Sequence, residues 1–211
     1  MKGLIISSGE IKDYKLLKQT SSESDYIVCA DGGVNHLLKV GMVPDMVIGD
    51  LDSIGEDELS IIKKKNIKIN EFPQMKDETD TELCVEHLIQ KGIRDITLMG
   101  VTGSRMDHTI ANIYLLKKIY IKGAKASVIN ENNRIYYLEG ELDLKRRDGY
   151  YISIIPLTEK GAVVSLSGFL YPLESELIEF SSTRGISNKI IDNFGRIKIH
   201  KGQAIIIESR D

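Results

Sequence analysis

Three apolar runs in the first 80 residues are each followed by a short acidic segment. The segments are DGG at 31–33, GDLDS at 49–53 and DETD at 77–80. Ligands of an open parallel sheet bind outside the carboxyl ends of its strands, so these segments are expected to converge on one crevice. Up to five carboxylates then share one edge of the sheet, those of Asp31, Asp50, Asp52, Asp77 and Asp80.

Such a group of carboxylates is tolerable when it holds a divalent cation, because like charges at a buried strand end otherwise repel one another. Oxygen-only ligands favour Mg²⁺, which usually keeps some of its waters and shares its shell with substrate phosphates. The pattern therefore predicts a magnesium site and a nucleotide polyphosphate as the bound partner.

A fourth segment, GVTGSR at 100–105, follows another predicted strand and has the composition of a phosphate-binding loop. Gly100, Gly103 and the start of the next helix can supply backbone N–H groups to phosphate, with Arg105 and Lys76 as charged donors. Neither G-x-x-x-x-G-K-[ST] nor G-x-G-x-x-G occurs in the chain. This absence argues against a P-loop kinase and against a dinucleotide-dependent dehydrogenase.

Each segment also has a purely structural explanation. Thr79 and Glu82 have the spacing of a capping box, and Ser104 with Asp107 repeats it. Paired glycines after Asp31 are compatible with turn chemistry alone. The alternating carboxylates of the 49–53 segment are the hardest to explain without a cation.

The elements that must position these segments follow from the hydrophobic pattern. Up to about residue 131, short apolar runs alternate with amphipathic stretches, which is typical of an α/β domain with a Rossmann-like parallel sheet. A helix is predicted over 79–91 and another over 104–120. Their expected buried faces are Thr81, Cys84, Val85 and Leu88 in the first, and Met106, Ile110, Ile113 and Tyr120 in the second. Strands are predicted at 4–6, 26–30, 46–48, 67–72, 96–99 and 126–129.

After Asn130 the pattern changes to strand-like runs separated by turn residues, with no convincing helix of ten or more residues. This pattern predicts a small all-β domain, so the chain divides into residues 1–131 and 132–211. Strands are predicted there at 150–156, 162–166, 177–180, 196–200 and 203–208.

Length and charge bound the remaining possibilities. The chain has 211 residues and a net charge of −3, from 28 basic and 31 acidic side chains. This balance disfavours a nucleic-acid partner. No stretch approaches the ~20 apolar residues that span a bilayer, and the start lacks a signal-peptide core, so no membrane partner and a cytoplasmic location are expected. Cys29 and Cys84 form no C-x-x-C motif, which favours two reduced, packed thiols over a zinc site.

Taken in order, these segments resemble the thiamine pyrophosphokinase (thiamine diphosphokinase) family. In the second half, GFLYPL at 168–173 and STRGISN at 182–188 are similar to that family's vitamin-binding β domain. The first half contributes ADGG at 30–33, 44–53, DETD at 77–80 and GVTGSRMDHTIAN at 100–112.

The resemblance implies an α/β catalytic domain joined to a β-sandwich domain, in a homodimer with the active site between subunits. It implies transfer of the diphosphoryl group of ATP to the hydroxyl of thiamine, giving thiamine diphosphate and AMP. Asp50, Asp52 and Asp80 would hold Mg²⁺ and serve catalysis, and Tyr171, Ser187 and Asn188 would bind thiamine, Tyr171 standing where some relatives carry tryptophan. The implied nucleotide-site residues are Asp31, Asp77, Gly100, Thr102, Gly103, Ser104, Arg105 and Asp107.

Two other classes of function stay open on the residues themselves. One is another Mg²⁺-dependent nucleotidyl or glycosyl transferase, and the other is a nucleotide-binding sensor whose β domain recruits a partner. Tyr171 and the Ser187-Asn188 pair are also compatible with ordinary turns. His108 is a candidate base by its chemistry only.

Overall fold

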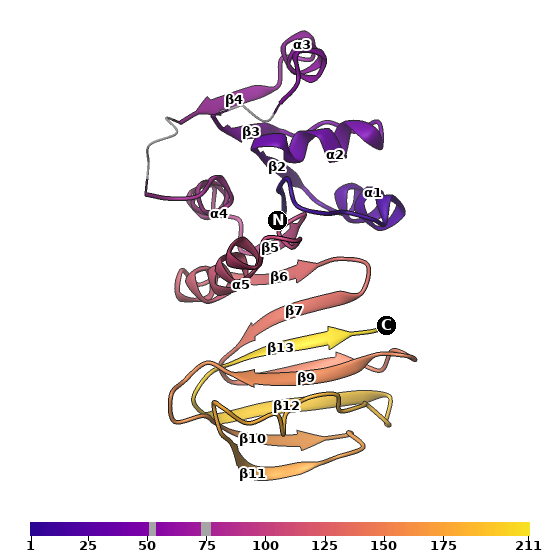
Figure 1. The fold of residues 1–211 in the computed structure, drawn as a ribbon, viewed down its shortest axis with the longest axis vertical. Helices are drawn as coiled ribbons and strands as arrows, with labels where there is room; N and C mark the ends of the chain where they lie inside the picture. Colours follow the sequence, from indigo (N-terminus) through magenta and orange to yellow (C-terminus); the bar gives the residue numbers. More distant parts are fainter. Residues whose placement is uncertain (51–53, 73–76) are drawn as a thin grey trace. The chain divides into compact units, whose positions relative to one another are not determined.

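The structure, a computed structural model, describes residues 1–50, 54–72 and 77–211 and has an α/β fold (Figure 1). The chain forms two compact units, Met1–Glu131, called unit 1 below, and Asn132–Asp211, called unit 2. No helix among the described residues is long and apolar enough to cross a membrane.

Unit 1 is built around a parallel sheet with the strand order β4-β3-β2-β1-β5-β6. From β1 the chain runs outward through β2, β3 and β4, and it then returns to the other side of β1 to add β5 and β6. The strand order thus reverses between β1 and β5, which is where open α/β sheets bind ligands. The strands are β1 (Lys2–Ile6), β2 (Tyr26–Ala30), β3 (Met46–Gly49), β4 (Lys68–Glu71), β5 (Asp95–Met99) and β6 (Lys125–Ile129).

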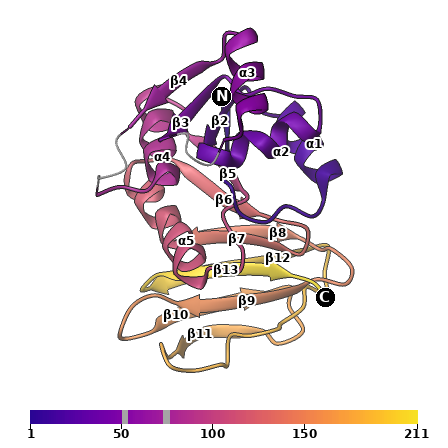
Figure 2. The same ribbon diagram turned by 45° about the horizontal axis from the view of Figure 1, so that its top comes forward.

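Helices cover both faces of this sheet, with α1 and α2 on one face and α4 and α5 on the other (Figures 1 and 2). Leu17 of α1, Leu37 of α2 and Ile62 of α3 pack into one buried cluster with the apolar side chains of the strands. Acidic residues in the first turn of α3 and lysines in its last turn complement the helix dipole. The helices are α1 (Tyr14–Ser22), α2 (Val34–Lys39), α3 (Glu56–Lys64), α4 (Asp80–Gln90) and α5 (Met106–Ile121), with a 3₁₀ turn, η1, at Asp31–Gly33.

The predicted buried face of α4 is confirmed, since all four of its expected core residues are buried. The predicted face of α5 is wrong, because Met106, Ile110 and Tyr120 are exposed and the buried side chains are Asn112, Leu115, Leu116 and Ile119. Apolar residues surround α5 almost completely, so the 3.6-residue period does not single out one side.

Unit 2 is a sandwich of two antiparallel sheets, ordered β7-β13-β9 and β11-β10-β12-β8. Side chains such as Ile154, Ile206, Val164 and Ile197 form one core between the two sheets. The sequence prediction missed β7 and β8 and shifted β11 toward its C-terminus. The strands are β7 (Asn133–Leu138), β8 (Glu141–Lys145), β9 (Tyr151–Pro156), β10 (Ala162–Ser167), β11 (Leu173–Ile178), β12 (Phe194–Lys201) and β13 (Ala204–Ser209).

The two cysteines belong to the core of unit 1. Cys29 on β2 and Cys84 on α4 are both buried free thiols. Burial raises the pKa of the Cys29 thiol, because the thiolate loses its hydration there. A protonated, inaccessible thiol packs as a small apolar side chain.

Candidate active site

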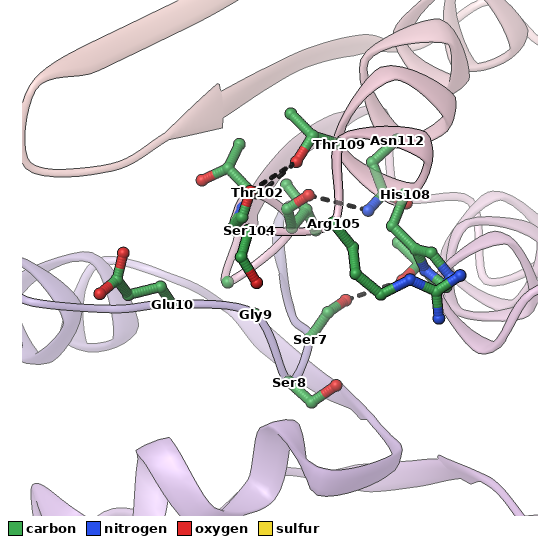
Figure 3. A pocket seen from close by; sticks show the side chains of 14 residues that line it. Ser7, Ser8, Gly9, Glu10, Thr102, Ser104, Arg105, His108, Thr109 and Asn112 are labelled. Carbon is green, nitrogen blue, oxygen red and sulfur yellow. Dashed lines mark hydrogen bonds between the residues drawn. The ribbon is translucent and has the colours of Figure 1, made fainter.

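A cavity of about 520 Å³ opens in unit 1 at the reversal of strand order. Its walls are the loops that follow β1 and β5 and the first turns of α4 and α5 (Figure 3). This is the crevice that the topology favours for a ligand. The lining residues are Ser7, Ser8, Gly9, Glu10, Thr81, Gly100, Val101, Thr102, Gly103, Ser104, Arg105, His108, Thr109 and Asn112.

The two loops that form its walls are hydrogen-bonded to each other beyond the ends of their strands. The backbone N–H of Ser7 donates to Met99 O at 2.9 Å, that of Gly9 to Gly100 O at 2.7 Å and that of Glu10 to Thr102 O at 3.0 Å. These bonds extend the pairing of β1 with β5 into the cavity wall. The loops are therefore set relative to each other by backbone geometry.

Glycine is required at two points of this contact. A Cβ on Gly9 would lie 2.4 Å from Gly100 O, and a Cβ on Gly100 would lie 2.2 Å from Ser7 O. Gly100 also has a φ of +65°, where a side chain is strained. The close approach of the loops explains both glycines without any appeal to turn formation.

Side chains of helix α5 are hydrogen-bonded to the backbone of the loop that follows β5. Asn112 Nδ2 donates to Val101 O at 2.9 Å, and the backbone N–H of Gly103 donates to Thr109 Oγ1 at 3.2 Å. The Gly103 N–H, proposed from the sequence as a phosphate donor, is thus engaged with Thr109. Asn130 Nδ2 donates to Thr102 Oγ1 at 3.2 Å, which fixes the residue between Val101 and Gly103.

The capping alternative fits one of the two motifs and fails for the other. Thr79 caps α4, because its Oγ1 accepts from the backbone N–H of Glu82 at 3.3 Å. The residue before α5 is Arg105, and no side chain caps that helix. The hydroxyl of Ser104 therefore lines the cavity and does not cap α5.

Arg105 and Asp107 form an exposed ion pair at the cavity. Arg105 Nη2 lies 2.6 Å from Asp107 Oδ2, and both side chains are largely in solvent. The hydrogen bond from Arg105, followed by one from the His108 backbone, lowers the pKa of the Asp107 carboxyl. Such an exposed pair exchanges partners easily, so Arg105 is available to an incoming phosphate.

Of the acidic residues predicted for the site, the described ones, Asp31, Asp50, Asp77 and Asp80, do not line this cavity. Asp80 begins α4 next to Thr81, whose Oγ1 is hydrogen-bonded to Ser7 Oγ at 2.8 Å. Asp31 has a φ of +50° in η1, and a Cβ on Gly49 would lie 3.0 Å from Asp31 Cβ. Asp50 directly follows Gly49, so the structure brings the Asp31 and Asp50 segments together.

The sequence predictions for Asp52 and Lys76 stay open, because both lie outside the described residues. Asp77 is described and is exposed. Within residues 1–50, 54–72 and 77–211, no three His, Cys, Asp or Glu side chains form a group placed to hold a metal ion. The donor chemistry fits Mg²⁺, since the close approach at Gly49 leaves two carboxylate-bearing segments side by side.

Sequence reasoning missed the loop after β1, Ser7 to Glu10, although it forms one wall of the cavity. The signal was present, because small polar residues follow the first predicted strand as they follow the others. Thr81, Thr109 and Asn112 were missed because helix residues that turn inward at a strand end look like ordinary core positions.

In unit 2 the structure joins Tyr171 to Asn188. Asn188 is buried; its Nδ2 donates to Tyr171 O at 2.8 Å, and its Oδ1 accepts from the backbone N–H of Tyr171 at 3.1 Å. Its Oδ1 also accepts from the backbone N–H of Lys189 at 2.8 Å. Tyr171 as a residue is 65% exposed, so Asn188 holds its backbone while the side chain remains open to solvent.

Ser187 adjoins this pair with a left-handed backbone, at a φ of +62°. Its backbone N–H donates to Ser153 Oγ at 3.1 Å. Through its two hydrogen bonds to the Tyr171 backbone, Asn188 acts as a clamp on the segment that carries Tyr171.

Each unit matches the model of a known protein family. The family described as "Thiamin pyrophosphokinase, catalytic domain" matches residues 17–128, and "Thiamin pyrophosphokinase, vitamin B1 binding domain" matches residues 139–204. A thiamine pyrophosphokinase of Bacillus subtilis (strain 168) is 36% identical over 183 residues, which is 86% of this chain and 86% of the relative. Thiamin pyrophosphokinase 1 of Caenorhabditis elegans is 26% identical over 182 residues, 80% of this chain and 73% of the relative.

Solved structures show the same fold over the whole chain. The crystal structure of thiamine pyrophosphokinase from Bacillus subtilis has a TM-score of 0.90 at 31% identity and covers 100% of both chains. That of thiamin pyrophosphokinase from Geobacillus thermodenitrificans has a TM-score of 0.88 at 29% identity, covering 100% of this chain and 98% of the other.

Proposed function

The chain belongs to the thiamin pyrophosphokinase family, and on that premise we propose that the cavity of unit 1 is where ATP binds for the family's reaction. The chain is an ATP:thiamine diphosphotransferase, which gives thiamine diphosphate and AMP. The observation that carries our assignment is the position of the cavity at the reversal of strand order between β1 and β5.

The lining of the cavity suits an anionic substrate. Ser8 and Ser104 offer hydroxyl groups, and Arg105 offers a planar pair of donors to phosphate oxygens. We propose that Arg105 exchanges Asp107 for a phosphate when ATP binds.

We propose that Mg²⁺ is held by Asp50, Asp52 and Asp80, with Asp31 and Asp77 nearby. The support is the approach of Asp31 to Gly49 and the position of Asp80 at the start of α4. Bound there, the ion would neutralise charge on the phosphates. Carboxylate oxygens are among the ligands that Mg²⁺ prefers in proteins.

The protein's part in the transfer is mainly to position the two substrates, since phosphoryl transfer needs little covalent chemistry from the enzyme. The hydroxyl oxygen of thiamine attacks the β-phosphorus of ATP in line, the bond from that phosphorus to the oxygen of AMP breaks, and AMP leaves. The hydroxyl proton passes to a carboxylate, for which we propose one of the three aspartates. His108 lines the cavity and is a weaker candidate by chemistry only.

For the second substrate we propose the exposed ring of Tyr171, on which the cationic thiazolium of thiamine stacks. Ser187 precedes Asn188 in unit 2 and is proposed to contact the vitamin, whereas Asn188 is proposed to act through the Tyr171 backbone.

We further propose a cytoplasmic homodimer with its active site at the subunit interface. Exposed Met106, Ile110 and Tyr114, spaced by four residues on α5, support such self-association.

Removing divalent metal is expected to abolish turnover reversibly. The purified chain is treated with EDTA and desalted, and thiamine-dependent consumption of ATP is followed while MgCl₂ is added back. Activity should be lost with the chelator and recover fully with Mg²⁺, because the proposed site needs the ion to neutralise charge on the phosphates. Full activity in EDTA would contradict the proposed metal site.

A further inference from the structure

His36, in the short helix α2, is hydrogen-bonded to the cavity wall from outside. Its Nε2 lies 2.9 Å from Gly9 O, and its Nδ1 lies 2.9 Å from Tyr14 Oη. Gly9 lines the cavity, and His36 does not. The imidazole therefore ties the loop after β1 to two helices on one face of the sheet.

The carbonyl partner sets the tautomer of the neutral ring. A carbonyl oxygen only accepts, so Nε2 carries the hydrogen and donates it to Gly9 O. In the neutral ring Nδ1 is then the acceptor, and Tyr14 Oη donates to it. Tyr14 Oη in turn accepts from Lys39 Nζ at 3.4 Å, which completes a chain from Lys39 to Gly9.

Helix α2, which carries His36 and Lys39, is held against the sheet where it begins. A Cβ on Gly33, just before α2, would lie 2.1 Å from Ile6 O, so α2 starts in backbone contact with the end of β1. His36 is half-buried, and burial lowers the pKa of its imidazole, with Lys39 acting in the same direction and the Gly9 bond opposing both. This direction favours the neutral ring at neutral pH, with its Nε2 hydrogen donated to Gly9 O.

We infer that His36 is a positioning residue for the nucleotide cavity, holding the Gly9 carbonyl so that the loop from Ser7 to Glu10 keeps its shape for ATP. This inference rests on the proposed function of the cavity. With the carbonyl turned to His36, its partial negative charge is directed at an N–H group and not at an incoming phosphate. The Gly9 N–H stays bonded to Gly100 O on the other side.

The test replaces His36 by leucine, which keeps the bulk of the ring and removes the donor. The KM for ATP should rise about three- to tenfold, the range expected for one lost hydrogen bond. The kcat and the KM for thiamine should stay within about twofold, because the loop contributes to ATP binding equally before and during transfer. His36→Gln, whose amide can still donate to Gly9 O, should restore most of the ATP affinity.

The chain supplies a matched control in His87 on α4. Its Nε2 lies 3.4 Å from Tyr26 Oη, and the two rings are 5.9 Å apart, as are those of His36 and Tyr14. His87 does not line the cavity, so His87→Leu should leave both KM values unchanged. Should His36→Leu fail to fold, Tyr14→Phe removes the donor that orients the ring and should raise the ATP KM about twofold.

Calorimetric titration with ATP in the absence of thiamine separates the outcomes. Unchanged ATP affinity in both His36→Leu and Tyr14→Phe, with tight binding by the unaltered chain, would overturn the role of His36 alone. Absence of ATP binding by the unaltered chain would overturn the proposed function together with this inference. Weakened binding in His36→Leu, with rescue by His36→Gln and none of it in His87→Leu, supports the inference.

Discussion

Replacing Asp52 by asparagine is expected to lower kcat about a hundred- to thousandfold while the fold stays intact. The amide keeps the shape of the side chain and removes its charge, which the proposed site needs to bind Mg²⁺ beside the phosphates. Losses of this size are usual when one electrostatic contributor to a transition state is removed. Asp50→Asn should behave in the same way, since it lies at the same strand end.

The measurement is steady-state kinetics at saturating ATP, thiamine and Mg²⁺, with thermal unfolding as the check on the fold. Asp95→Asn is the matched control, because Asp95 is an exposed aspartate at the first residue of β5, at the opposite edge of the same sheet. Its kcat should be unchanged. Full activity of Asp52→Asn would remove this aspartate from the mechanism.

The second large effect is expected at Tyr171. Tyr171→Ala should raise the KM for thiamine about tenfold and leave the KM for ATP unchanged, because a cation on an aromatic face gains roughly 1–2 kcal/mol when it is desolvated. Asn188 holds the backbone on both sides of the ring, so the loop should keep its course when the ring is removed.

Two further variants separate stacking from bulk at this position. Tyr171→Phe keeps the aromatic face and should retain nearly all thiamine affinity, whereas Tyr171→Leu keeps apolar bulk without the face and should resemble Tyr171→Ala. An equal rise in the KM for both substrates would argue against stacking on this ring. Both KM values come from initial rates with the other substrate saturating.

The sequence predicted well what depends on short-range pattern. Polar residues immediately after apolar runs located the strand ends, and the period of Thr81, Cys84, Val85 and Leu88 located the buried face of α4. Parallel pairing then follows from the alternation of strands and helices. The same reasoning, applied to the first strand, would have found the loop from Ser7 to Glu10.

What the sequence did not predict depends on contacts between distant segments. The buried face of α5 was misassigned because apolar side chains surround that helix, and only packing selects Leu115, Leu116 and Ile119. The bond from His36 to Gly9 O joins residues 27 apart in the chain, and no local period encodes it. The clamp of Asn188 on Tyr171 is likewise visible only once two loops of the sandwich lie side by side.

A net charge of −3 gives the chain no cationic field of its own to attract an anionic partner. The proposed magnesium site changes this locally, because acidic residues gathered at strand ends attract a cation that in turn binds phosphate. Arg105 and the hydroxyl groups of the cavity lining add further donors for phosphate in the same unit. A mildly acidic chain can therefore hold a polyphosphate without a basic surface.

The central claim, diphosphoryl transfer from ATP to thiamine, is tested most directly by identifying the products. The purified chain is incubated with Mg²⁺, thiamine and ATP labelled either at the α- or at the γ-phosphorus, and the products are separated by chromatography. The α-label should appear in AMP and the γ-label in thiamine diphosphate, in equal amounts. Formation of ADP with thiamine monophosphate, or no thiamine-dependent turnover, would contradict the account.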